Sequence, residues 1–145
     1  MCVLLAVNFV VPRGLRVAVK NQQVRTVGPA LVSVAGRLLQ TRCQRGAEIA
    51  RLLRFSEGVA AGIYSLDEHW SGQGKPDQLQ GEAIPIYARI ALLSQVVDVF
   101  HTADGKDAAM DEVRRRSGQW FDPKLVGAME AVAADEGFWT TLRGS

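Results

Sequence analysis

The stretch Asp67-Glu68-His69-Trp70-Ser71-Gly72-Gln73-Gly74-Lys75-Pro76 is the most informative part of this chain. From Ser71 to Gly81 the sequence has glycine at three positions and one proline among polar residues, a composition typical of a loop. Glycine supplies the backbone freedom that a tight loop requires. The segment 71–81 therefore predicts a glycine-rich loop between two helical regions.

The residues after this loop predict the most regular helix of the chain. Pro85 suits the first position of a helix, and apolar residues then recur at steps of four and three. They are Ile86, Ile90, Leu93, Val97 and Phe100. We expect a helix of about 17 residues that buries this stripe.

Two helices and a short third one are predicted before the loop, over residues 27–40, 45–54 and 56–66. Phe55-Ser56 predicts a break, with Ser56 as the N-cap of the short helix. The apolar face of the second helix is expected at Ile49, Leu52 and Leu53.

Two further helices are predicted beyond a turn at Asp104-Gly105. The first ends in three arginines, residues 114–116, which we expect to be solvated where positive charge is favoured, with phosphate binding as the alternative. Asp122 suits the N-cap of the second helix and Pro123 its first turn. The apolar faces are expected at Ala109, Met110 and Val113 and at Leu125, Met129 and Val132.

No segment alternates with a period of two for long enough to build a sheet, so the predicted fold class is all-α. The length of 145 residues fits one domain, and 48% apolar with 22% charged residues is the composition of an ordinary soluble protein. Phe138 and Trp139 are expected to fold back onto the core.

The formal net charge of +2 is too small to indicate a nucleic acid polymer or a membrane as partner. Two cysteines, Cys2 and Cys43, make no disulfide framework, so a reducing cytoplasm is the expected location. The apolar run Met1–Val11 is too short for a membrane span, which needs about 20 residues. A buried segment, a segment that packs on something upstream and a membrane anchor are the alternatives for it.

Further motifs follow the quoted stretch in order. They are Leu79-x-Gly81, Ile84-Pro85, Ala88-Arg89-Ile90, Asp98 and Trp120-Phe121-Asp122-Pro123. This series resembles the HD-GYP family, a branch of the HD phosphohydrolases, and Cys43 to Ile49 is similar to the family's His-Pro-x-x-Gly-x-x-Ile segment. The resemblance spans about residues 42–127. It implies an HD-domain-like helical bundle that binds metal ions, usually iron or manganese, and hydrolyses a cyclic dinucleotide such as cyclic di-GMP.

The chain departs from the family at most metal-ligand positions. No histidine precedes His69, so the family's His-Asp element is absent. The substituted positions hold Cys43, Leu66, Asp67, Ser71 and Gln95, and the loop tyrosine is Lys75. Because a metal site needs several converging ligands, a degenerate site is expected.

The same resemblance selects the remaining candidates. Those for binding iron, manganese or zinc are Cys43, Asp67 and Asp98, and those for catalysis are Asp67, Glu68 and His69. The candidate ligand-binding residues of the loop region are Gly72, Gly74, Lys75, Pro76 and Arg89. His69 falls at a variable position and is expected to be a polar contact. Glu68 is expected to pair with Arg89, and Asp98 to tie the loop to its helix.

Three functions stay open at this point. The first is a degenerate HD-GYP-like domain, truncated at its N-terminal side, that regulates or binds through a cyclic dinucleotide or a signalling protein. The second is an active phosphohydrolase with atypical ligands, and the third a helical protein–protein interaction module. The expected organisation is a segment of unclear relation, 1–41, and an HD-GYP-like domain, 42–145. A homodimer is a further expectation, because a shortened bundle would expose an apolar face.

Overall fold

The computed structural model describes residues 29–143, with side chains from residue 40 to residue 142. The regular elements within this range are all helical. They are α3 (Pro29–Leu52), α4 (Glu57–Tyr64), the 3₁₀ turn η1 (Gly81–Ala83), α5 (Ile86–Arg115), α6 (Pro123–Ala133) and α7 (Glu136–Arg143). The predicted all-α class is confirmed. The predictions for Met1–Val11 lie outside the described residues.

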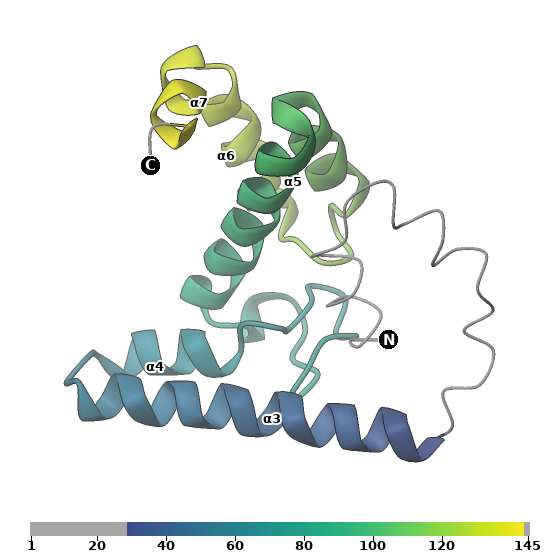
Figure 1. The fold of residues 1–145 in the computed structure, drawn as a ribbon, viewed down its shortest axis with the longest axis vertical. Coiled ribbons are helices and arrows are strands. Elements are labelled where there is room, and N and C mark those ends of the chain that lie inside the picture. The colour runs from purple at the N-terminus through teal and green to yellow at the C-terminus, as the bar shows by residue number, and fades with distance from the viewer. Residues whose placement is uncertain (1–28, 144–145) are drawn as a thin grey trace.

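The helices pack in the order in which they follow along the chain. α3 and α4 lie side by side, α5 rises from this pair, and α6 and α7 cover its far end (Figure 1). The glycine-rich loop lies in the segment that connects α4 to α5. The helix pair and the far end of α5 therefore form two regions, joined by one long helix.

The helices predicted at 27–40 and 45–54 are one continuous helix, α3, so a break between them was wrongly expected. The boundary predicted between residues 41 and 42 lies within α3 and stays a prediction. The break at Phe55-Ser56 is confirmed, since the Ser56 hydroxyl accepts a hydrogen bond from the Val59 amide. α4 ends at Tyr64, two residues before the predicted end at Leu66.

The apolar face predicted for the end of α3 is wrong. Ile49, Leu52 and Leu53 are exposed, whereas α3 buries Cys43, Ala47 and Ala50. The reason lies in α4, which faces α3 with Ala60 and allows a close approach of the two helices. A Cβ added at Gly46 would lie only 2.9 Å from a methyl carbon of Ile63. Small residues, not large apolar ones, mark the buried side.

The predicted regular helix is confirmed as the first part of α5, and Gly105 interrupts α5 with φ 85° and ψ −179°, where the turn was expected. Pro85 is the N-cap residue, one position earlier than predicted. The buried face is shifted from the predicted stripe, because Ile86 and Ile90 are exposed. The buried residues of the first part are Ala88, Leu92, Leu93, Val96 and Val97. Ala88 lies where α4 crosses closely at Gly62.

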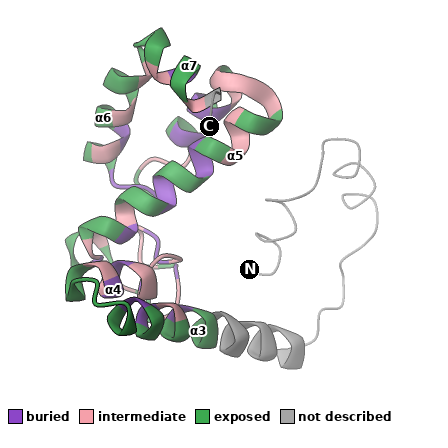
Figure 2. Cartoon of the chain, turned by 60° about the vertical axis from the view of Figure 1, so that its left-hand side comes forward, coloured by how far each residue is buried: buried purple, intermediate pink, exposed green. Residues whose placement is uncertain are grey.

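The main core lies between α5, α6 and α7 (Figure 2). Its fully buried members include Val96, Val113, Phe121 and Trp139. The indole N–H of Trp139 donates to the Ala133 carbonyl at 2.9 Å, which confirms that the end of the chain folds back onto the core.

Two details of the later helices complete the fold. The Asp122 carboxylate accepts a hydrogen bond from the Lys124 amide at 2.9 Å, so its predicted role as N-cap is confirmed. Arg114 and Arg115 are exposed as predicted, but Arg116 is not, because it pairs with the buried Glu112 beneath the aromatic ring of Trp120. No helix within residues 29–143 is long and apolar enough to cross a membrane.

Candidate functional site

The glycine-rich loop is held by backbone hydrogen bonds to the turn before α6. The Trp70 amide donates to the Trp120 carbonyl at 3.1 Å, and the Ser71 amide donates to the Gln119 carbonyl at 2.9 Å. The Lys75 amide donates to the Asp67 carbonyl at 3.0 Å and closes the loop on its own stem. The stem residues 67–70, which include the catalytic candidates, are therefore fixed in place.

Gly74 is the closest-packed position of this loop. A Cβ added there would lie 2.6 Å from the Asp67 carbonyl oxygen and closer still to the His69 amide nitrogen. Both neighbours belong to the backbone and cannot move aside as a side chain could. The predicted candidate Gly74 is thus required by the loop geometry itself.

Glu68 closes the other side of the loop. It is 2% exposed, and its Oε1 accepts a hydrogen bond from the Asp77 amide at 2.6 Å. Burial raises the pKa of Glu68, while backbone N–H groups of Asp77, Leu79 and Gln78 favour its carboxylate. Glu68 therefore supports the loop from within.

The predicted pair of Glu68 with Arg89 is wrong. Arg89 donates instead to the buried Asp122 carboxylate at 2.8 Å and lies over the ring of Trp70 at 5.8 Å. The start of α5 directs Arg89 toward the turn before α6, while Glu68 faces the loop backbone. Arg89 joins α5 to the N-terminus of α6, and little of its side chain is exposed.

Cys43 and Asp67 are the two metal-ligand candidates that the structure brings together. The Cys43 Sγ lies 3.7 Å from Asp67 Oδ2 and donates to it. The same carboxylate oxygen accepts a hydrogen bond from Arg42 Nη2 at 2.6 Å. Burial, followed by the nearby Asp67 charge, raises the pKa of the Cys43 thiol. Since the thiolate is the form that ligates metals, this arrangement disfavours metal binding by Cys43.

Arg42 is the residue of this site that sequence reasoning missed. The only signal in the sequence was that Arg42 is a basic residue directly before the candidate ligand Cys43. Arg42 and Asp67 are 25 positions apart in the sequence. The third metal candidate, Asp98, lies exposed on α5, and within the described residues it makes no hydrogen bond to the loop. The expected tie between Asp98 and the loop is therefore wrong.

His69 is packed as an aromatic ring. It is buried and stacks on Trp120 with 4.4 Å between ring centroids, and Arg116 lies 3.7 Å from the centroid of the same Trp120 ring. Burial lowers the pKa of His69 to about 4, because it disfavours the imidazolium; Asp67 opposes this shift and Arg116 adds to it. His69 is therefore neutral in the folded protein at neutral pH.

We expect acid to destabilise the fold through His69. The unfolded chain takes up this proton near pH 6.5, whereas the folded chain takes it up only near pH 4. The free energy of unfolding should therefore fall as the pH drops from 6.5 to 4, by up to about 3 kcal/mol from this group. Urea unfolding of the wild type and of His69→Gln at several pH values checks this. Parallel pH profiles of the two proteins would contradict it.

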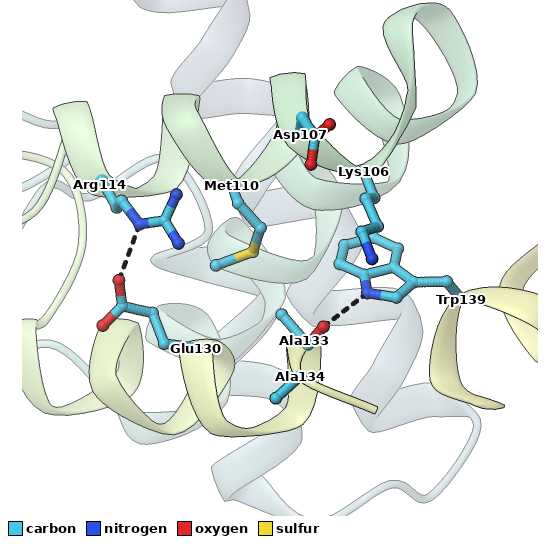
Figure 3. Close-up of a pocket in the computed structure, with 8 residues that line it drawn as sticks. All are labelled: Lys106, Asp107, Met110, Arg114, Glu130, Ala133, Ala134 and Trp139. Atoms are coloured by element: carbon cyan, nitrogen blue, oxygen red, sulfur yellow. Dashed lines mark hydrogen bonds and ion pairs between the residues drawn. The ribbon is translucent and has the colours of Figure 1, made fainter. Parts of the chain in front are cut away.

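A pocket of about 250 Å³ lies apart from these candidates, between α5, α6 and α7 (Figure 3). Met110, Ala133 and Trp139 form its apolar side. The ion pair of Arg114 with Glu130 stands at one side, and Lys106, which pairs with Glu136, stands at another. None of the candidate catalytic, metal-binding or loop residues lines this pocket, but Arg114, one of the three arginines considered for phosphate binding, does.

Comparison with known proteins agrees with this arrangement. The family described as HD domain matches residues 27–125. The chain belongs to the HD-domain family. This also confirms the resemblance noted in the glycine-rich loop and the motifs after it.

The relatives of this HD domain are phosphodiesterases. The chain is 55% identical over 111 residues to 3'3'-cGAMP-specific phosphodiesterase 3 of Vibrio cholerae, which covers 77% of the chain and 24% of the relative. It is 42% identical over 71 residues to a cyclic di-GMP phosphodiesterase of the same organism, covering 45% of the chain and 14% of that protein. The chain thus spans about a quarter or less of these relatives.

A solved structure shares the fold. The crystal structure of a cyclic GMP-AMP specific phosphodiesterase of Vibrio cholerae superposes with a TM-score of 0.74 at 46% identity. The match covers 88% of this chain and 34% of that chain. The HD-domain bundle predicted from the motifs is confirmed.

The side chains at the ligand positions do not fit a metal centre. No group of three or more histidine, cysteine, aspartate or glutamate residues converges in the described part of this HD domain. The Asp67 oxygen that faces Cys43 already accepts two hydrogen bonds, and Glu68 is turned into the loop. Metal-dependent chemistry would need ligands that converge with open positions.

Proposed function

We propose that this HD domain is a regulatory or binding module without metal-dependent phosphodiesterase activity of its own. The observation that carries the proposal is the pairing of Asp67 with Arg42 and Cys43. A ligand oxygen already held by a guanidinium and a thiol is a poor partner for a metal ion. Glu68 and His69, the other catalytic candidates, are engaged by the loop backbone and by Trp120.

We propose a cyclic dinucleotide as the ligand of the module. The printed names of the relatives specify 3'3'-cGAMP and cyclic di-GMP. Such a ligand carries phosphodiester charges, which arginine and lysine recognise. Lys75 is the one cation that the glycine-rich loop contributes. Arg89, the other predicted contact, is already engaged by Asp122.

A second candidate is an active phosphodiesterase with atypical ligands, a reading favoured by the 55% identity to an enzyme of that name. The 3.7 Å between Cys43 Sγ and Asp67 Oδ2 also keeps two ligand atoms close together. In this reading Arg42 would have to leave Asp67 before a metal could bind. The two candidates differ in whether the purified protein holds metal.

A third candidate is a protein–protein interaction module. Most of the large exposed apolar side chains lie at the end of α3 and the start of α5. They are Ile49, Leu52, Leu53, Phe55, Ile86, Tyr87 and Ile90. Where exposed apolar side chains form a contiguous surface, that surface often marks an interface. The predicted homodimer stays a prediction.

One experiment on protein purified without chelator separates these functions. Metal content is measured first, followed by hydrolysis of 3'3'-cGAMP and cyclic di-GMP with added Fe²⁺ or Mn²⁺. We expect less than stoichiometric metal, no turnover above buffer, and binding by calorimetry that Lys75→Ala weakens about tenfold.

Two other outcomes would overturn the proposal. Stoichiometric metal together with turnover would establish the phosphodiesterase. If neither dinucleotide binds and the metal content is less than stoichiometric, the interaction module is favoured. Lys124→Ala, which removes an exposed lysine that pairs with the exposed Glu82, is the control and should leave binding unchanged.

A further inference from the structure

Asp67 links the glycine-rich loop to α3 through two different groups. Its backbone carbonyl accepts the Lys75 amide at 3.0 Å and so closes the loop. Its side chain reaches α3, where Arg42 and Cys43 both donate to Oδ2. This side chain therefore provides a polar connection between α3 and the stem of the loop.

Arg42 is placed as a counter-ion of Asp67. Its Nη2 lies 2.6 Å from the carboxylate oxygen, which is a short, charge-assisted distance. The Asp67 side chain is 25% exposed and the Arg42 side chain 66%, so solvent reaches the pair and screens it from the side of Arg42. A guanidinium balances the carboxylate charge as a metal ion would, but it has no open coordination position and cannot activate water.

We propose that Arg42 is the built-in cation of this HD domain, which occupies the place beside Asp67 that a metal would need and fastens the glycine-rich loop to α3. The inference rests on the proposed function in one respect, namely that Asp67 holds no metal. It adds that Asp67 has a cationic partner of its own on α3. The order of the loop should then be independent of divalent ions.

A double-mutant cycle tests the link between the two residues. Arg42→Gln, Asp67→Asn and the double variant are compared with the wild type by urea unfolding in the presence of chelator. We expect each single change to lower the folding equilibrium constant about fivefold, and the double variant to lose little more than either single one. Arg42→Lys should recover part of the loss, because it keeps the charge but not the planar fork.

Hydrogen exchange gives a local readout of the same link. Amides of residues 71–81 should exchange about fivefold faster in Arg42→Gln and in Asp67→Asn than in the wild type. Arg45→Gln is the matched control, since it removes an exposed arginine one turn further along α3, and it should change neither stability nor loop exchange.

Two results would overturn the inference. Additive losses in the cycle would show that Arg42 and Asp67 act separately. A wild-type melting temperature that rises with Mn²⁺ and falls with chelator, with the rise abolished in Asp67→Asn, would show that a metal and not Arg42 serves Asp67. Hydrolytic activity without such a rise would overturn the proposed function but leave the coupling of Arg42 to Asp67 intact.

Discussion

Replacement of Gly74 by alanine is expected to prevent the glycine-rich loop from closing and to cost at least about 3 kcal/mol of stability. The added Cβ would lie 2.6 Å from the Asp67 carbonyl oxygen and nearer to the His69 amide nitrogen. Because these atoms belong to the backbone, the strain cannot be relieved by a change of rotamer. The hydrogen bond from Lys75 to Asp67 would have to open. Urea unfolding followed by circular dichroism measures the loss.

Gly127→Ala is the matched control for this change. Gly127 lies within α6, and a Cβ there would meet no atom within 4 Å. Because alanine is the better helix former, this variant should be more stable than the wild type by up to about 1 kcal/mol. A Gly74→Ala protein as stable as the wild type would show that the loop does not have the described geometry.

Replacement of Trp139 by alanine is expected to detach α7 from the core, at a cost of about 3–5 kcal/mol. Trp139 is 1% exposed, contacts the rings of Phe138 and His101, and donates a hydrogen bond to the Ala133 carbonyl. α7 is only eight residues long, so few other contacts hold it. Thermal unfolding and hydrogen exchange of α7 measure the effect.

Trp139→Phe separates packing from the hydrogen bond. It keeps a large ring in the core but loses the indole N–H, so it should cost about half as much as the alanine variant. Val132→Ala, at an exposed position of α6, should stay within about 0.5 kcal/mol of the wild type. Equal stability of Trp139→Ala and the wild type would contradict the placement of α7.

The site and the fold depend on the same stretch of chain. Glu68, His69 and Asp67 follow one another at the stem of the glycine-rich loop, and each has a partner that supports the loop. This arrangement holds the glycine-rich loop of the HD domain in place through three consecutive side chains. The prediction for Gly74 tests the packing of the loop on the backbone of Asp67, and the prediction for Arg42 tests the contact of the Asp67 side chain with α3.

Local signals were sufficient for several elements. The glycines and proline of the loop, the break at Phe55-Ser56 and the Asp122 cap were predicted because turns and caps depend on residues close in sequence. The turn at Gly105 was predicted for the same reason, and the structure places this residue at φ 85°. The order of the motifs was enough to indicate the HD-domain family.

The burial of α3 could not be predicted from its hydrophobic residues. Its buried face is built from Ala47, Ala50 and Cys43, while Leu52 and Leu53 are exposed. A pattern of large apolar residues predicts the buried face only when the partner helix leaves room for them. α4 approaches α3 closely at Ala60, and Ile63 of α4 reaches Gly46, so only small residues of α3 fit at this contact.

The sequence by itself determined the all-α class, the glycine-rich loop and the family, because each depends on residue types at fixed local spacing. The tertiary structure alone decided the partners of the charged candidates. Arg42 meets Asp67 across 25 positions and Arg89 meets Asp122 across 33, on elements that come together only when the helices pack. Charge pairing over such separations has no local signature in the sequence. Which cation pairs with Asp67, at the stem of the glycine-rich loop, could therefore be learned only from the folded chain.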